Sequence, residues 1–344
     1  MSFNKNVKLA FIIACLAIFA VNSIYVFYTH INSEYMASDR DDALRTSITG
    51  FLRGKNPYKD NIAEVHPAGT VRFQTFSYGT VYFLFYLLFY LIMNVFNIKF
   101  IGVFVAANIF ATGIMIYYID KFNSPILFLI PIYMSFILKG SNILVLTAMT
   151  AFIFYHLKDE DYVKSAIALA IAVSTKPFPL LIVPFWIFDR RVHIKHVIIF
   201  GLTWLIPTFL FGLLGPYYVF KSTILFHIFG RKGYAFIGGT IGYKIFGNYT
   251  DIILALSLTL IFLLRINNQL DVISIALSNL SFILFSPVFS SSYSQYFDPI
   301  FAICAYVLLY KNKDRILKRT IFNPLLLHLI GIANDEKEIS EILP

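Results

Sequence analysis

The segment "ASDRDDALRTSITGFLRGKNPY", residues 37–58, is polar in an otherwise apolar chain. Its three acids, Asp39, Asp41 and Asp42, follow an apolar run at residues 9–28 that is long enough to cross a membrane as a helix. Hydrophobic residues make up 58% of the 344 residues, which is too many for a soluble protein whose surface must carry charge. We therefore expect these acids to lie at a membrane surface, at the start of a loop.

Apolar runs recur along the chain and predict an all-α, polytopic membrane protein with about ten transmembrane helices. The expected spans are residues 7–28, 76–97, 100–119, 124–138, 142–157, 163–188, 195–213, 251–267, 271–288 and 295–311. Residues 1–320 would form one transmembrane domain, and residues 321–344 a cytoplasmic tail, part of which could lie on the inner membrane surface. The two cysteines lie inside apolar runs, so the sequence predicts neither a disulfide framework nor a zinc site.

Basic residues cluster at the ends of the apolar runs, which is typical of membrane orientation signals and not of a nucleic-acid surface. The clusters are Lys5 and Lys8, then Arg190, Arg191 and Lys195, then Lys311, Lys313, Arg315, Lys318 and Arg319. With ten crossings, they place both termini in the cytoplasm and the loops 29–75, 214–250 and 290–298 outside. The same alternation puts the charged loop 158–164 outside, although basic residues in short loops usually mark the cytoplasmic side.

Residues 43–52 follow the acids and can form a short helix with an apolar face of Ala43, Ile48, Phe51 and Leu52. The sequence "GKNPY", residues 54–58, then predicts a rigid turn, because Pro57 biases the preceding residue toward extended backbone. A helix that lies on the surface and is followed by a rigid turn would hold a carboxylate in a fixed place above the bilayer.

Three further segments carry charge or turn signals in apolar surroundings. Lys176 precedes two prolines in "STKPFPLLIVPFWIFDRR", residues 174–191, and a charge inside the membrane costs about 2.5–3.5 kcal/mol unless it has a partner or a wet cavity. "HIFGRKGYAFIGG", residues 227–239, places Arg231 and Lys232 in a glycine-rich loop. "SPVFSSSYSQYFDP", residues 286–299, begins with a Ser-Pro pair and contains Tyr293.

Together these segments resemble the GT-C superfamily of integral-membrane glycosyltransferases, and most closely its polyprenyl-phosphate-mannose-dependent mannosyltransferases. Many of these carry an acid, about fourteen residues and then Gly-x-x-Pro-Tyr, which is similar to Gly54–Tyr58 here, with Asp39, Asp41 and Asp42 upstream as candidates for the acid. Asp39-Arg40-Asp41 resembles the Asp-x-Asp of related enzymes. The Lys-x-x-Pro-Leu-Leu pattern that begins at Lys176 is also found in many members of this family. Two positions differ from the family: Ser141 stands where Gln is usual, and no His follows Ser286 and Pro287.

The resemblance implies an inverting transfer of a sugar, most readily mannose, from a polyprenyl-phosphate donor to a lipid or glycan acceptor outside the cell membrane. Asp41, Asp39 or Asp42 would be the catalytic base, with Asp41 the first choice. Arg231, then Arg72, then Lys176 would stabilise the leaving phosphate, with Lys232 beside Arg231. Tyr58, His227 and Tyr293 complete the expected substrate-binding set.

No cofactor or metal is expected, although Asp39 and Asp41 could hold an ion. Two alternatives remain open at this point. One is a lipid or solute transporter, which explains the spans and Lys176 but not the acids with "GKNPY". The other is an inactive GT-C fold that binds lipid.

Overall fold

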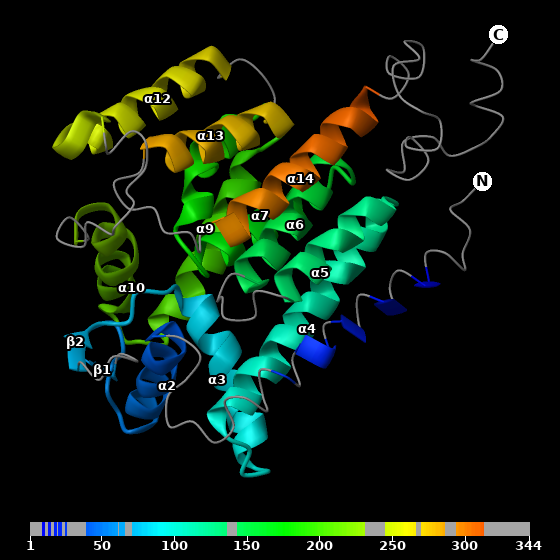
Figure 1. Cartoon of the computed structure of the whole chain (residues 1–344). Coiled ribbons are helices and arrows are strands. Elements are labelled where there is room, and N and C mark those ends of the chain that lie inside the picture. Colours follow the sequence, from blue (N-terminus) through cyan, green and yellow to red (C-terminus); the bar gives the residue numbers. More distant parts are fainter. Residues whose placement is uncertain are drawn as a thin grey trace, which may run out of the picture.

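The computed structural model describes residues 39–60, 62–65, 71–135, 143–230, 245–265, 270–285 and 294–312, with scattered positions between residues 9 and 25. The predicted first span and the tail beyond residue 312 therefore lie outside the described residues. The described chain is largely helical, as the sequence predicts, with one two-stranded hairpin that it does not (Figure 1). The elements are α2 Asp39–Leu52, β1 Ile62–Val65, β2 Val71–Gln74, α3 Thr80–Asn94, α4 Phe100–Lys121, η1 Pro125–Phe128, α5 Leu129–Ser135, α6 Ile143–Leu157, α7 Tyr162–Val173, η2 Phe178–Leu181, α8 Val183–Ile187, α9 Ile194–Phe209, α10 Gly215–Val219, η3 Phe220–Gly230, η4 Gly247–Tyr249, α12 Thr250–Arg265, α13 Val272–Phe285 and α14 Ser294–Lys311.

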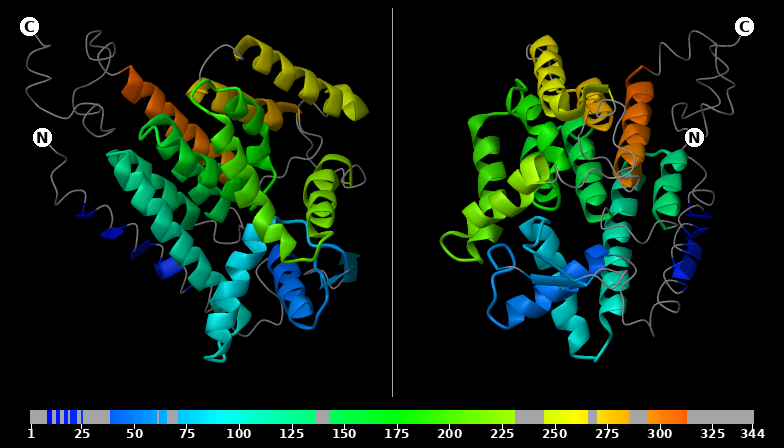
Figure 2. Two further views of the ribbon diagram at one scale, coloured as in Figure 1. Left: turned by 180° about the vertical axis from the view of Figure 1, so that it is seen from behind. Right: turned by 60° about the vertical axis from the view of Figure 1, so that its left-hand side comes forward.

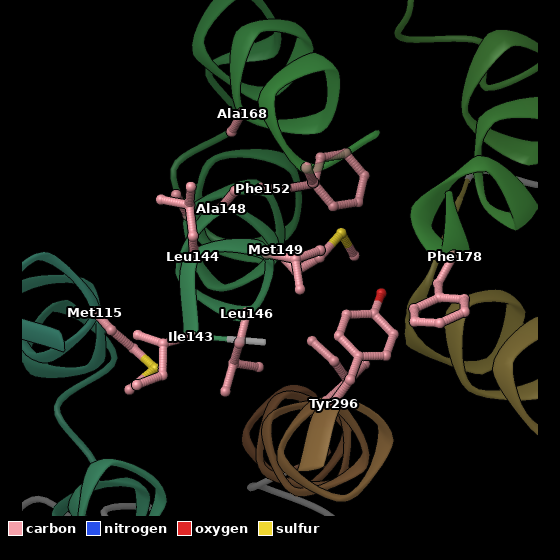
Figure 3. Packing of buried hydrophobic residues seen from close by; sticks show 14 of the residues in the cluster. Met115, Ile143, Leu144, Leu146, Ala148, Met149, Phe152, Ala168, Phe178 and Tyr296 are labelled. Atoms are coloured by element: carbon pink, nitrogen blue, oxygen red, sulfur yellow. The ribbon is translucent and has the colours of Figure 1, made fainter. Parts of the chain in front are cut away.

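The helix α6 forms the centre of the bundle. All its residues except Tyr155 are buried, and it packs against α4, α7 and α14. A helix that is apolar on every side is expected to be buried on every side, so this position follows from its sequence. Figure 3 shows the packing around it, with Tyr296 of α14 and Phe178 of η2 facing each other beside Met149. The helices α12 and α13 pack together at one end of the molecule, and α2 with the strands β1 and β2 lies at the other (Figures 1 and 2).

Within the described residues, α4 alone is long and apolar enough to cross a hydrocarbon core by itself. The helices α3, α6, α7 and α9 are apolar but have 15, 15, 12 and 16 residues. At 1.5 Å per residue these are about 18–24 Å long, less than the ~30 Å of a hydrocarbon core. Most predicted span boundaries agree with the helices to within a few residues, but the spans are shorter than a simple crossing requires.

The predicted single span 163–188 is wrong. The helix α7 ends at Val173, the chain turns through Lys176 and two prolines, and η2 and α8 run back toward the start of α7. Proline has no backbone N–H and cannot continue the helical hydrogen bonds, which is why the apolar run does not form one helix. The two ends of the segment meet, because the Arg191 guanidinium lies 5.5 Å from the centre of the Tyr162 ring. The segment is a helical hairpin.

This hairpin also corrects the predicted position of the loop 158–164. Lys158 Nζ donates a hydrogen bond to Lys121 O at 2.7 Å and lies 5.4 Å from the centre of the Tyr310 ring. His156 Nε2 lies 3.0 Å from Asp189 Oδ2. The loop 158–164 therefore lies at the same end of the bundle as residues 189–195 and 311, and not opposite them. We call this end, where residues 121–124, 156–162, 189–196 and 306–311 gather, the Asp189 end.

Residues 215–230, which the sequence places in a polar connection, are helical. The helices α10 and η3 occupy residues 215–230 without interruption, and η3 is a π-helix. Gly212 has a φ of +91°, and this glycine makes the turn between α9 and α10. The chain thus turns sharply after α9 and is helical over residues 215–230 instead of forming an open loop. Residues 231–244 lie outside the described residues.

The helices α7 and α3 meet at their ends, although the contacting residues Gly79 and Ser174 lie 95 positions apart in the chain. Gly79 N–H donates to Thr175 O at 3.2 Å, and Val81 N–H donates to Ser174 O at 3.1 Å. The last carbonyls of one helix thus accept from the first amides of the other, so groups that helix ends normally leave without partners satisfy each other. The opposite partial charges of the two helix ends also attract. We call this contact the α7–α3 junction.

Gly79 is required at this junction because there is no room for a side chain. A Cβ built on Gly79 would lie 1.9 Å from Ser174 O. We therefore expect Gly79→Ala to push the two helix ends apart and to lower the free energy of unfolding by about 1–3 kcal/mol, as overpacking does. The measurement is the midpoint of thermal unfolding of the purified protein in detergent.

Gly113→Ala is the matched control, because a Cβ at Gly113 of α4 has no atom within 4 Å. Alanine favours a helix over glycine, so this variant should unfold at the same temperature or higher. If Gly79→Ala unfolds at the temperature of Gly113→Ala, the α7–α3 junction is not as close as described.

Candidate active site

The acids Asp39, Asp41 and Asp42 lie in the first turn of α2, so they belong to the helix and do not precede it. Carboxylates are favourable at that position because the N-terminal end of a helix carries partial positive charge. The face of α2 that packs inward is formed by Leu44, Ser47 and Ile48, which are all buried. The expected apolar face is thus correct at Ile48 and at Phe51, whose ring packs against Phe83 and Phe211, but Leu52 is 48% exposed.

The predicted turn at "GKNPY" is present, and Asn56 holds it. Gly54 has a φ of +83°, which glycine adopts without strain. The side-chain amide of Asn56 donates to Phe211 O at 2.9 Å, and its Oδ1 accepts from Tyr58 N–H at 3.0 Å. The backbone N–H of Asn56 donates to Asp60 Oδ2 at 2.7 Å. One side chain therefore closes the turn and fastens it to the residues that follow α9.

Tyr58, one of the expected substrate-binding residues, is buried in the structure. It is 2% exposed and packs edge-on against Phe76 and Phe211, at centroid distances of 5.8 and 4.8 Å. Burial raises the pKa of its phenol well above the usual value, so it does not ionise near neutral pH. Tyr58 anchors the turn in the core.

A chain of aromatic contacts leads from this turn to Lys176. Phe76 contacts Tyr78 at a centroid distance of 5.4 Å, and Phe76 N–H donates to Pro57 O at 2.8 Å. The Lys176 Nζ lies 5.4 Å from the centre of the Tyr78 ring and 5.8 Å from that of Phe178. Residues 75–79 thus connect the α2 turn to the α7–α3 junction.

Lys176 is 3% exposed and lies directly after the end of α7. Two features stabilise a buried ammonium there: the partial negative charge at the helix C-terminus and the negative faces of the two rings. Two hydroxyls at the junction, Thr80 Oγ1 and Ser174 Oγ, are buried without a hydrogen-bond partner among the described residues. Buried polar atoms of this kind are places where internal water is usually held.

The other expected site residues are only partly placed. Arg72 is on β2, directly opposite Glu64 of β1 in the antiparallel register. His227 belongs to η3. Arg231, Lys232 and Tyr293 lie outside the described residues. The structure thus brings together α2, the turn and Lys176, and it leaves the predicted phosphate contacts of Arg231 and Arg72 untested.

A second polar cluster, at the Asp189 end, was missed by the sequence analysis. Asp189 Oδ2 accepts from Arg191 at 2.7 Å and from Leu270 N–H at 2.8 Å, and it lies 3.0 Å from His156 Nε2. His156 Nδ1 is 3.1 Å from Ser165 Oγ. The signals in the sequence are a histidine inside an apolar run and an aspartate directly before an arginine pair.

The order serine, histidine, aspartate is that of a hydrolase triad, but this cluster is built as a clamp. Ser165, His156 and Asp189 are at most 1% exposed, so the serine hydroxyl cannot meet a substrate. Burial alone would raise the pKa of Asp189, yet the hydrogen bonds from His156 and Arg191 hold it well below its usual range. The carboxylate stays charged and ties α6 and α7 to the start of α9 and, through Leu270, to α13.

No family model, curated protein or solved structure matches this chain.

The clamp predicts a large loss of stability on removal of the Asp189 charge. Asp189→Asn leaves the partly buried Arg191 without its counter-ion, and breaking a buried ion pair costs about 3–5 kcal/mol. The expected result is a marked fall in the thermal unfolding midpoint at neutral pH. Asp161→Asn is the matched control, because its pair with Lys164 is exposed and asparagine preserves the N-cap of α7. Equal midpoints for the two variants would contradict a clamping role.

Proposed function

We propose that the protein is a polytopic membrane glycosyltransferase that moves a sugar, most readily mannose, from a polyprenyl-phosphate donor to a lipid or glycan acceptor. The observation that carries the proposal is the connection of three features through one series of contacts. The first turn of α2 carries three acids, Asn56 fastens the turn after α2 to Phe211, and aromatic contacts join that turn to the buried Lys176. The helix that carries the acids is thus connected, through the turn at its other end, to Lys176.

The chemistry needs a base and a positive charge. A carboxylate of α2, with Asp41 the first choice, takes the proton of the acceptor hydroxyl as that oxygen attacks the anomeric carbon of the sugar. The bond from that carbon to the lipid phosphate breaks, and the phosphate leaves with the bonding electrons. Arg231, or Arg72, offers a guanidinium to the leaving phosphate, where a paired fork of donors fits its oxygens. Lys176 is the weaker candidate for this role because its ammonium is buried under Tyr78 and Phe178.

A transporter is the second candidate function, and the α7–α3 junction is the observation in its favour. Transporters bind substrates between half-helices whose free N-terminal ends face an anion. Here the amides of Gly79 and Val81 at the start of α3 already donate to Thr175 and Ser174, so these two donors are not available to a substrate. The acid-bearing α2 and its turn also have no role in transport. The transferase therefore accounts for more of the molecule.

The direct test is to incubate the purified protein in lipid with a panel of polyprenyl-phosphate sugars and to measure the masses of the lipids by mass spectrometry. A lipid that gains one hexose with the mannose donor supports the proposal. Passage of an intact donor or solute across the vesicle membrane, without any mass gain, would support the transporter instead.

Asp41→Asn should lower the turnover of this transfer by about 10²–10⁴-fold, the usual contribution of a general base. Folding should be unaffected, since the acid lies in the first turn of α2 and asparagine is also tolerated there. Asp39→Asn and Asp42→Asn are the matched controls on the same turn. Near-normal transfer by Asp41→Asn beside an inactive Asp39→Asn would move the role to Asp39. Normal transfer by all three variants would remove the mechanism.

A further inference from the structure

An apolar groove of about 430 Å³ lies between η1–α5 and α14. One wall is a single helical face of Ile126, Leu129 and Tyr133, and these side chains are 38–50% exposed. The other wall is the face of α14 with Asp298, Ala302 and Ala305. The groove has room because the two alanine side chains are small. Its exposed walls open to the surroundings of the bundle.

The two ends of the groove differ in polarity. Near one end, the Tyr306 hydroxyl is already used, since it donates to Phe122 O at 2.6 Å at the Asp189 end of the bundle. At the other end, the Asp298 carboxylate accepts from the Tyr133 hydroxyl at a long 3.4 Å. Asp298 and Tyr306 are eight residues apart on α14, which is about 12 Å along the helix. The groove is thus an apolar slot with a carboxylate at one end.

The lining of the groove favours a narrow apolar chain. Its α14 wall carries small alanine side chains, and its lining residues other than Asp298 are apolar or aromatic. An extended hydrocarbon chain is narrow enough to lie along the alanines, and the apolar walls favour it.

The carboxylate decides which kind of lipid head group fits. The oxygens of Asp298 accept one long hydrogen bond from the described residues, so they have free capacity for donors. A head group that carries a phosphate would place a second negative charge beside Asp298, and like charges repel each other. Hydroxyl groups of an uncharged head group would instead donate to it.

We propose that this groove binds the hydrocarbon chain of a neutral lipid whose head-group hydroxyls donate to Asp298. The inference rests on the proposed function and deepens it, because it names the acceptor class as a hydroxyl-bearing, phosphate-free lipid of the diacylglycerol kind. The lipid chain lies along Ala302 and Ala305, and the head group lies at the Asp298 end, next to Phe297, whose ring contacts Phe178 beside Lys176.

The test is native mass spectrometry of the purified full-length protein in detergent with diacylglycerol or phosphatidylglycerol of the same chains. We expect diacylglycerol to be retained in preference to phosphatidylglycerol. Asp298→Asn should reduce this preference about tenfold or more, as expected for loss of a hydrogen bond to a charged acceptor. The double variant Ala302→Phe, Ala305→Phe should lose retention of both lipids, because two rings fill the groove.

Leu308→Phe is the matched control, since Leu308 is 42% exposed on α14 but does not line the groove. It should retain diacylglycerol as the wild type does, and all variants should keep the wild-type unfolding midpoint because the altered side chains are exposed. Equal retention of the two lipids by the wild type would overturn the proposal. Unchanged retention in the double variant would also overturn it. In a cross-linking experiment, a photoreactive lipid chain that labels other helices would overturn it too, if a second copy of the protein or another segment of the chain is cross-linked at Ala302 instead.

The outcome also separates this inference from the proposed function. Diacylglycerol held at Asp298 by a protein that transfers no sugar from any donor would remove the transferase and leave the lipid site standing. Transfer to diacylglycerol with an unchanged KM in the double variant would remove the site and leave the transferase standing.

Discussion

The α7–α3 junction is the contact on which most of the described structure depends. Carbonyls of Ser174 and Thr175 accept from the first amides of α3, and Gly79 is the residue that lets the two backbones come this close. Neither helix alone is long enough to cross a hydrocarbon core, since their 12 and 15 residues are about 18 and 22 Å long. The junction thus joins two segments that lie far apart in the chain through their helix ends.

The consequences of this junction reach both ends of the molecule. Toward α2, the residues just before Gly79 carry the aromatic contacts that hold Tyr58 and the Asn56 turn. Toward the Asp189 end, the hairpin of α7 and α8 brings Asp189 back to His156, where the clamp closes. Because the hairpin does not cross the bundle, the basic residues of the loop 158–164 join those of residues 189–195 and 311. This gathering is what the tendency of basic residues to stay on the cytoplasmic side leads one to expect.

Much of the fold is predictable from the sequence because apolar runs of helical length are a strong, local signal. The helices α4, α6 and α9, the short helix after the acids and the turn at Asn56 all follow from such signals. The breaks do not, because hydropathy averages over Lys176 and its prolines and gives a single span. The junction is beyond local reasoning, since what Gly79 contacts is decided by Ser174 in a different segment.

The candidate site divides in the same way. Asp41 and its neighbours stand out as charges after an apolar run, and Lys176 as a charge within one. Tyr58 was expected to bind substrate, and only the packing around it shows that it anchors the turn in the core. Asp189 was overlooked because its partners, His156 and Leu270, come from other segments and no spacing announces them.

The central claim, that residues 162–189 return to the end from which they came, is tested by labelling single cysteines in intact cells with a membrane-impermeant reagent. Asp159→Cys and Lys195→Cys lie on exposed residues on either side of the hairpin, and Lys55→Cys lies on the α2 turn. The account predicts that positions 159 and 195 label alike, only after permeabilisation, whereas position 55 labels from outside. Labelling of position 159 from outside with position 195 protected would contradict the hairpin and restore a single helix through the membrane.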